Sequence, residues 1–272
     1  MDTGSVLTQA MTQGQLMHHA FMVAAKARLI PRRRRYELGL VARPHYAYGL
    51  GKAASEARSL GYDGITAIEF GVAGGNGLLA LEQHAEVIEE ETGIKITVVG
   101  FDTGAGLPPP TDYRDAPFLW DAGDFDMDQA ALRARLSRAE LVLGDVTQTA
   151  GEYARTMDHS RPIGFVSFDL DFWSSTVAAL EVFRGDAGTC IPRVWCYFDD
   201  VVGMIDDIGV PLAISEFNAD ASGRRLRQPW NLRQAVPFRP AWVDQMFQLH
   251  IFDHPRYTQM IATPKDRALP LG

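Results

Sequence analysis

The chain has 272 residues, 46% of them hydrophobic, which is enough for one large domain with a sizeable core. Its formal net charge of −8 argues against a general nucleic-acid-binding protein, which needs a basic face. Apolar runs stay well short of the roughly 18 residues of a membrane span, and two cysteines are too few for a disulfide framework or zinc cluster. We therefore expect a cytoplasmic protein that does not cross a membrane.

Residues 1–45 are expected to form an N-terminal helical extension. Apolar residues recur at helical spacing between Leu16 and Leu29, and this face could pack on the domain, cover a site or meet a second subunit. We expect a homo-oligomer formed through these helices. The basic run Arg32–Arg35 is interpreted as a solvated linker or a subunit contact rather than as a site for nucleic acid or acidic lipid.

Residues 46–272 alternate apolar strand patterns with helical patterns. The predicted strands are 65–70, 95–102, 139–145, 163–171 and 193–200, followed by an antiparallel pair at 246–252 and 256–263. The predicted helices include 46–60, 78–91, 128–136 and 174–183. This order predicts an α/β fold with a doubly wound, mostly parallel, seven-stranded Rossmann-like sheet and an antiparallel C-terminal edge strand.

A glycine-rich turn follows the first predicted strand, in the sequence IEFGVAGGNG of Ile68–Gly77. Glycines there remove the Cβ atoms that would block close approach, so backbone N–H groups can face a nucleotide-like ligand. Gly75, Gly77 and Ala80 also satisfy G-x-G-x-x-G/A, which leaves a nicotinamide dehydrogenase as an alternative. The match is weak because Gly75 lies near the helix start rather than at the strand end.

Acidic residues stand at or just after the predicted carboxyl end of every parallel strand. These ends meet at one edge of a parallel sheet, where open α/β sheets bind ligands. Each acid alone could be a helix N-cap, but five strand ends in succession favour a site that holds cations or hydrogen-bond donors. The acids are Glu69, Asp102, Asp145, Asp169 with Asp171, and Asp199 with Asp200.

Two roles separate along this edge. Asp102 ends the second strand, where an acid can accept both hydroxyls of a ribose, and Asp145 ends the third, near the position of an adenine edge. The four acids of the last two parallel strands are hard oxygen ligands suited to Mg²⁺, whereas zinc would favour His or Cys. Capping acids without a metal remain the alternative.

These residues resemble the class I S-adenosylmethionine-dependent methyltransferases, and most closely the macrocin O-methyltransferase family. The resemblance covers about residues 69–220. It rests on E-x-G at Glu69–Gly71, FDTGAGLP at Phe101–Pro108, GDV at Gly144–Val146, DLDFWSST at Asp169–Thr176 and FDDVV at Phe198–Val202. It implies that residues 46–272 form a methyltransferase domain that uses S-adenosylmethionine and Mg²⁺ to methylate a hydroxyl of a small molecule, such as a sugar of a natural product.

The resemblance also implies roles for individual residues. Asp169 and Asp171 would be catalytic, with Asp171 either a further metal ligand or the general base for the acceptor hydroxyl. Independently of the resemblance, His159 or His254 could act as a base, but the residues alone favour a surface or core role for both. The metal ligands would be Asp169, Asp199 and Asp200. The cofactor contacts would be Glu69, Phe70, Gly71, Val72, Gly75, Asn76, Asp102, Thr103, Asp145, Val146 and Asp169. A cofactor-binding partner protein without catalytic activity remains a further alternative.

Overall fold

The structure is a computed structural model that describes residues 17, 20, 22–24, 29–157, 159–202, 206–220 and 223–261. Much of the predicted N-terminal amphipathic face, including Leu16, lies outside the described residues. The Arg32–Arg35 run lies in helix α2 (Arg32–Glu37), where Arg32 pairs with Glu90 and Arg34 pairs with Glu37 at 2.7 Å. Among the described residues, no helix combines the length and the apolar character that a membrane crossing requires.

Seven strands form one sheet in the order β3-β2-β1-β4-β5-β7-β6. The predicted fold class is confirmed: β1 to β5 are parallel, and β7 runs antiparallel between β5 and the edge strand β6. The strands are β1 (Gly64–Phe70), β2 (Lys95–Asp102), β3 (Glu140–Leu143), β4 (Ile163–Phe168), β5 (Cys190–Phe198), β6 (Arg224–Arg227) and β7 (Met246–Ile251).

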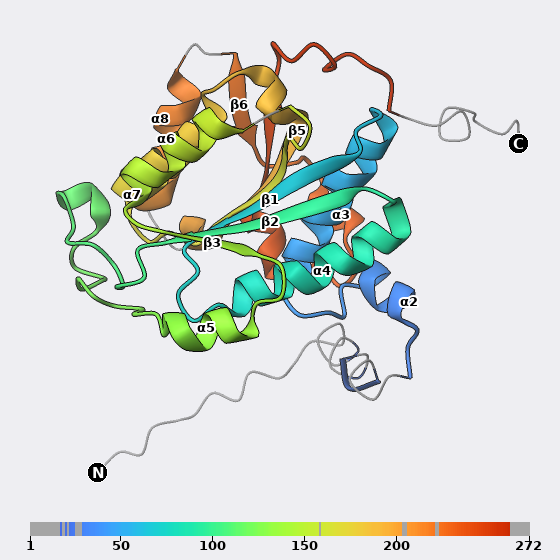
Figure 1. The fold of residues 1–272 in the computed structure, drawn as a ribbon, viewed down its shortest axis with the longest axis horizontal. Helices are drawn as coiled ribbons and strands as arrows, with labels where there is room; N and C mark the ends of the chain where they lie inside the picture. The colour runs from blue at the N-terminus through green and yellow to red at the C-terminus, as the bar shows by residue number, and fades with distance from the viewer. Residues whose placement is uncertain are drawn as a thin grey trace, which may run out of the picture.

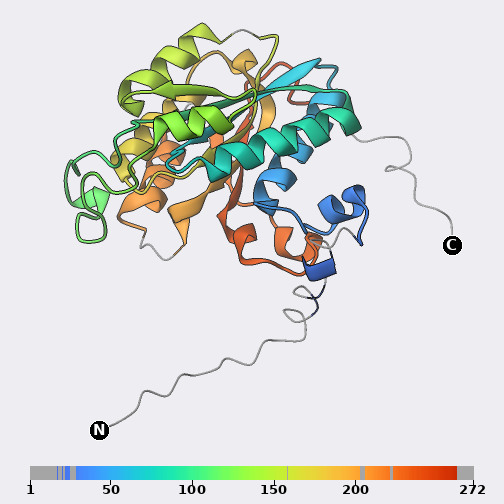
Figure 2. The ribbon, with the colours of Figure 1, turned by 60° about the horizontal axis from the view of Figure 1, so that its bottom comes forward.

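Helices cover both faces of the sheet, as Figures 1 and 2 show. On one face, α3 (Pro44–Ser59) packs against β1, β4 and β5, and α4 (Asn76–Thr92) packs against β2. On the other face, α7 (Trp173–Leu180) packs between α6 (Val146–Thr156) and α8 (Gly209–Ala219). Both faces of β1 and β4 are thereby buried, which explains why these strands read as continuous apolar runs.

The predicted C-terminal hairpin is wrong in its second strand. Residues 256–259 form turns and a bend, and residues 262 and 263 of the predicted strand lie outside the described residues. Arg256 donates a hydrogen bond to the Leu60 carbonyl oxygen at 2.8 Å instead of joining the sheet. The partner of β7 is β6, whose sequence RRLR carries no apolar alternation. Arg224 is nevertheless buried there, because its guanidinium donates to the carbonyl oxygens of Phe183 and Gly185.

A row of four phenylalanines crosses the centre of the sheet, one at the end of each of four neighbouring strands. Ring centroids lie 4.8 Å apart between Phe101 and Phe70, 5.5 Å between Phe70 and Phe168, and 4.5 Å between Phe168 and Phe198. The row sets the level at which the core ends. The next residue on each strand is the first at the ligand-binding edge, and these residues are Asp102, Gly71, Asp169 and Asp199.

Replacing Phe168 by alanine should lower the free energy of unfolding by about 3–5 kcal/mol, because the ring is fully buried and its loss leaves a cavity. The ring contacts Phe70, Phe198 and Phe183, so neighbouring strand ends would also lose support. Phe118→Ala is the matched control, since that ring is 72% exposed and its removal should cost less than about 0.5 kcal/mol. Urea unfolding measures both; equal losses would contradict the packing described.

Candidate functional site

The glycine turn lies where the strand order reverses, between β1 and β4, which is where open α/β sheets bind ligands. Gly71 has a φ of 82° and its N–H donates to the Phe101 carbonyl oxygen at 2.9 Å. A Cβ at Gly71 would stand 1.9 Å from the carbonyl oxygen of Asp169. Glycine is therefore required here both by the backbone conformation and by the close approach of the two strand ends.

A cavity of about 360 Å³ opens at this edge of the sheet. It brings together nearly all of the predicted site residues, from the turn after β1 to the acids after β4 and β5. Glu69 alone among them does not line it. Those that do are Phe70, Gly71, Val72, Gly75, Asn76, Asp102, Thr103, Asp145, Val146, Asp169, Asp171, Asp199 and Asp200.

The two acids predicted to hold a nucleoside also fix the loops around them. Asp102 Oδ2 accepts hydrogen bonds from the N–H groups of Val72 and Ala73, each at 2.8 Å, and so holds the glycine turn in place. Asp145 caps α6, since its Oδ1 accepts from the Thr147 N–H at 2.8 Å. Each carboxylate has further lone pairs that can face the cavity, so capping and ligand binding are compatible.

Glu69 lies beneath the turn rather than in the cavity wall. Its side chain is 1% exposed, and its Oε1 accepts a hydrogen bond from the Tyr46 hydroxyl at 2.6 Å. The Tyr46 oxygen accepts in turn from Ser167 Oγ at 2.8 Å, while Glu69 Oε2 has no partner among the described residues. Burial raises the pKa of Glu69 to about 8, against the opposing effect of the Tyr46 hydrogen bond. Its predicted role as a direct cofactor contact stays a prediction.

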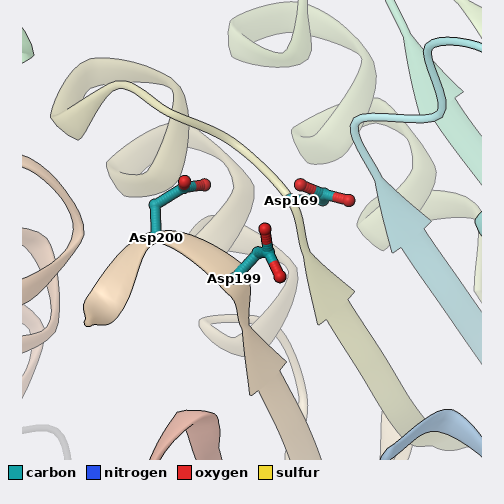
Figure 3. A group of neighbouring side chains, drawn as sticks. All are labelled: Asp169, Asp199 and Asp200. Carbon is teal, nitrogen blue, oxygen red and sulfur yellow. The ribbon is translucent and has the colours of Figure 1, made fainter. Parts of the chain in front are cut away.

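Three carboxylates meet at the ends of β4 and β5 (Figure 3). Asp169, Asp199 and Asp200 each offer one oxygen, and these oxygens lie within 4.8 Å of one another. Asp199 Oδ1 accepts from the Tyr197 hydroxyl at 2.5 Å, and the Asp199 carbonyl oxygen accepts from Gln245 Nε2 at 2.6 Å. Asp200 Oδ2 is buried and has no hydrogen-bond partner in the described part of the chain.

This crowding disfavours the charged forms of the acids. Burial, followed by the neighbouring aspartates, raises the pKa of Asp200 to about 8. Burial and then Asp199 raise the pKa of Asp169 to about 7, and burial raises that of Asp171 to about 6. Such a cluster is stable as carboxylates only with a positive charge among them. A buried oxygen without a partner and an all-oxygen donor set fit a hard divalent cation such as Mg²⁺.

Arg43 is a site residue that the sequence did not predict. It lines the cavity at the start of α3, with Nη1 3.8 Å from Asp169 Oδ2 and the guanidinium carbon 5.3 Å from the centroid of the Tyr46 ring. Tyr46 was predicted only as part of a helix. Nothing in the local pattern of either residue marks a site, because their positions depend on how α3 packs against β4 and β5.

Neither histidine considered as a base lies at the cavity. His159 Nε2 is 3.2 Å from Asp186 Oδ1 on another part of the surface, and His254 is buried beside Tyr62, whose hydroxyl lies 3.3 Å from its Nε2. Both histidines thus occupy the surface and core positions that the sequence favours for them, away from the cavity. His45 is nearer: its ring stacks on Tyr197 at 4.0 Å, and burial lowers its pKa to about 3.

Glu69→Gln should flatten the pH dependence of stability. The folded state holds the Glu69 proton up to about pH 8, whereas an unperturbed glutamate, with a pKa of 4.5, releases it. The folded state therefore binds the extra proton between these values, and stability falls as pH rises through this window. We expect Glu69 to contribute about 3 kcal/mol of this fall between about pH 5 and 8.

Urea unfolding of the metal-free protein at both pH values measures this effect. The variant keeps the raised pKa values of Asp169, Asp171 and Asp200, so part of the decline should persist. Identical pH dependence in wild type and Glu69→Gln would show that Glu69 does not hold a proton in the folded protein.

Comparisons with known proteins support the fold. No family model matches the chain, and no curated protein matches it. The crystal structure of CalS11, a calicheamicin methyltransferase, aligns with a TM-score of 0.53 at 20% identity over 93% of this chain and 100% of that chain. An apo structure of CalS11, described as a TDP-rhamnose 3'-O-methyltransferase, has a TM-score of 0.44 at 21% identity over 90% and 97% of the two chains. A Bacillus cereus O-methyltransferase in complex with SAH has a TM-score of 0.38 at 14% identity over 89% of this chain and 92% of that chain.

The described strands and the solved structure of CalS11 agree in architecture, and the site lies at the switch point that this architecture provides. The chain therefore has a Rossmann-like α/β fold, the fold that the solved structure of CalS11 also has.

Proposed function

We propose that the protein is an S-adenosylmethionine-dependent O-methyltransferase that uses Mg²⁺ and acts on a hydroxyl of a small molecule. The observation that carries this proposal is the sharing of one cavity by two sets of groups. A glycine turn with Asp102 and Asp145 forms one part, and the triad Asp169, Asp199 and Asp200 forms another. The first set suits a nucleoside with a charged tail, and the second suits a hard cation beside an acceptor oxygen.

The chain's own residues would bind and orient the reactants. Val72, Ala73 and Gly75 present their backbone at the turn, and the Asp102 carboxylate that holds the turn also reaches the cavity. Asp169 joins the two halves, because it follows β4 at the switch point and belongs to the acidic triad. Holding two reactants in line in this way removes much of the entropic barrier to transfer.

Bound together, S-adenosylmethionine would supply the electrophilic methyl group and Mg²⁺ would lower the pKa of the acceptor hydroxyl. Asp171 would then take the hydroxyl proton on a carboxylate oxygen. It lines the cavity, and its pKa of about 6 leaves it mostly ionised at neutral pH and able to accept a proton. With the two histidines excluded by their positions, Asp171 is the base that the geometry supports best.

A screen for methyl uptake tests the proposal. The protein would be incubated with labelled S-adenosylmethionine and with Mg²⁺ or EDTA, against panels of glycosides and catechols. Because the solved CalS11 structure is that of a calicheamicin methyltransferase, natural-product acceptors are the first to include. We expect transfer to a hydroxyl that Mg²⁺ stimulates. Transfer that is indifferent to EDTA would contradict the metal's role, and hydride transfer with NAD would favour the dehydrogenase alternative.

The proposal also covers the natural-product class of the substrate, the location of the enzyme and its assembly. We infer a cytoplasmic enzyme that assembles as a homo-oligomer through residues 1–45. Sedimentation of the full chain and of a chain that starts at residue 29 compares the two assembly states directly. The same number of chains per particle in both would contradict an interface formed by the segment before residue 29.

A further inference from the structure

Residues 103–127, here called the cover segment, connect β2 to α5 (Gln129–Arg135) and form one wall of the cavity. Its two halves are joined by backbone hydrogen bonds, from the Leu107 N–H to the Asp124 carbonyl oxygen at 2.8 Å and from the Gly123 N–H to the Leu107 carbonyl oxygen at 2.9 Å. The cover segment therefore behaves as one unit. Its residues that line the cavity include Leu107, Pro108, Trp120 and Phe125.

A buried carboxylate joins the cover segment to α7. Asp115 is 0% exposed, and its Oδ1 accepts from the Ser174 N–H at 2.8 Å while its Oδ2 accepts from Ser174 Oγ at 3.0 Å. The same Oδ2 accepts from the N–H of Thr111 at 2.7 Å and from its hydroxyl at 2.6 Å. Ser174 lies in the first turn of α7, where N–H groups have no partner inside the helix. Asp115 thus caps a helix of another segment.

A second contact holds the same two elements together. The guanidinium carbon of Arg114 lies 3.5 Å from the centroid of the Trp173 ring, and Trp173 Nε1 donates to Glu216 of α8 at 2.8 Å. Arg114 and Asp115 are neighbours in the short 3₁₀ helix Tyr113–Asp115, so both contacts act on one rigid piece of the cover segment. The cover segment is therefore fixed to α7 by a buried and a half-exposed contact.

Residues 169–172, which include Asp169 and Asp171, lead directly into α7. Asp171 stands three residues before Ser174, and Asp171 and Ser175 both line the cavity. Asp115 itself does not line the cavity, so its effect on a ligand must pass through Ser174. A displacement of the first turn of α7 would move the Asp171 carboxylate, whereas the triad residues stand on the ends of β4 and β5.

We propose that Asp115 is a positioning residue for methyl transfer, which holds the cover segment on the first turn of α7 and so sets the place of Asp171 in the cavity. This inference rests on the proposed function. A buried carboxylate is a costly way to join two segments, since an apolar contact would pack them without desolvating a charge. Four hydrogen bonds from two segments instead fix both the distance and the orientation.

Asp115→Asn tests this role, because the amide places a donor group where the carboxylate accepted from Thr111 or Ser174. We expect kcat to fall about tenfold, with the affinity for S-adenosylhomocysteine and for Mg²⁺ nearly unchanged. Asp121→Asn is the matched control: it removes an exposed acid from the same segment, and Asp121 lines neither the cavity nor the contacts of Arg114 and Asp115 with α7. It should keep the wild-type kcat.

Ser174→Ala removes only the hydroxyl bond, and the double variant Asp115→Asn with Ser174→Ala should be no slower than Asp115→Asn alone. Additive losses would show that Asp115 does not act through Ser174 and would overturn the proposal. A lowered melting temperature with unchanged kcat would also overturn it, because Asp115 would then serve stability alone. If Asp115→Asn fails to fold, Ser174→Ala and Arg114→Met weaken the attachment of the cover segment to α7 from partly exposed positions, and wild-type kcat in both would overturn the proposal.

Hydrogen exchange separates this proposal from the proposed function. The Ser174 amide should be protected in wild type and should exchange about tenfold faster in Asp115→Asn, a result that needs no substrate. Unchanged exchange would contradict the capping contact even in an active enzyme. Conversely, a wild-type protein that shows the protected amide but binds no S-adenosylhomocysteine would overturn the methyltransferase proposal and leave the contact standing.

Discussion

Asp199→Asn and Asp200→Asn should each abolish Mg²⁺-stimulated methyl transfer while sparing the affinity for S-adenosylhomocysteine. Each change removes one negative charge from a set of three oxygens that lie within 4.8 Å of one another. Asp200 Oδ2 has no hydrogen-bond partner among the described residues, so a cation is the group best suited to satisfy it. Since changes to residues around metal ligands already cost about 10–100-fold in affinity, loss of a ligand should weaken Mg²⁺ binding by at least about 100-fold.

Calorimetry with Mg²⁺ and with S-adenosylhomocysteine measures the two affinities separately. Asp186→Asn is a suitable control, because that carboxylate is 68% exposed and lies outside the cavity. The metal assignment would fail if Asp199→Asn and Asp200→Asn kept wild-type turnover. Removal of a buried charge from a repelling cluster should also stabilise the metal-free protein, and more so at high pH, where the aspartates are ionised.

Gly71→Ala should remove cofactor binding altogether, with a loss of at least about 100-fold in affinity. The new methyl group would meet the Asp169 carbonyl oxygen at 1.9 Å, so β1 and β4 must separate at the switch point. Separation would displace the glycine turn and Asp169 together. The φ of 82° adds about 1 kcal/mol of strain for any residue with a Cβ.

Gly93→Ala separates the backbone strain from the steric clash. Gly93 ends α4 with a φ of 77°, almost the same as that of Gly71, and a Cβ there would have no atom within 4 Å. The control should lose about 1 kcal/mol of stability and keep its cofactor affinity. Titration with S-adenosylhomocysteine compares the variants; if Gly71→Ala bound as tightly as Gly93→Ala, the turn would not be the cofactor site.

The sheet was predictable because the strands that carry the site are buried on both faces. Their apolar runs end in phenylalanine followed by aspartate or glycine, and the row of rings aligns these ends at one level. Strand β6 escaped prediction because its buried arginine is satisfied by carbonyl oxygens of distant residues, not by any local pattern. The predicted strand after Asp253 is wrong for a related reason. Arg256 donates to the carbonyl oxygen of Leu60, just after α3, and the Tyr257 carbonyl oxygen accepts from Arg193 of β5.

The site residues likewise fall into a group that the sequence predicts and a group that it does not. Acids and glycines at strand ends are local features, so the sequence indicates them and the topology then gathers them. Arg43 reaches the cavity and Tyr46 reaches Glu69 only through the packing of α3, and Asp115 reaches Ser174 only through the fold of the cover segment. Such residues carry no periodic or motif signal, because their roles depend on contacts across long stretches of chain.

Titration of the wild-type protein with S-adenosylhomocysteine, in the presence of Mg²⁺, tests the central claim most directly. One binding site per chain with micromolar affinity, lost in Gly71→Ala and without any response to NAD, is the result we predict. Absence of binding to S-adenosylhomocysteine by the folded protein would contradict the account, whatever acceptor is supplied.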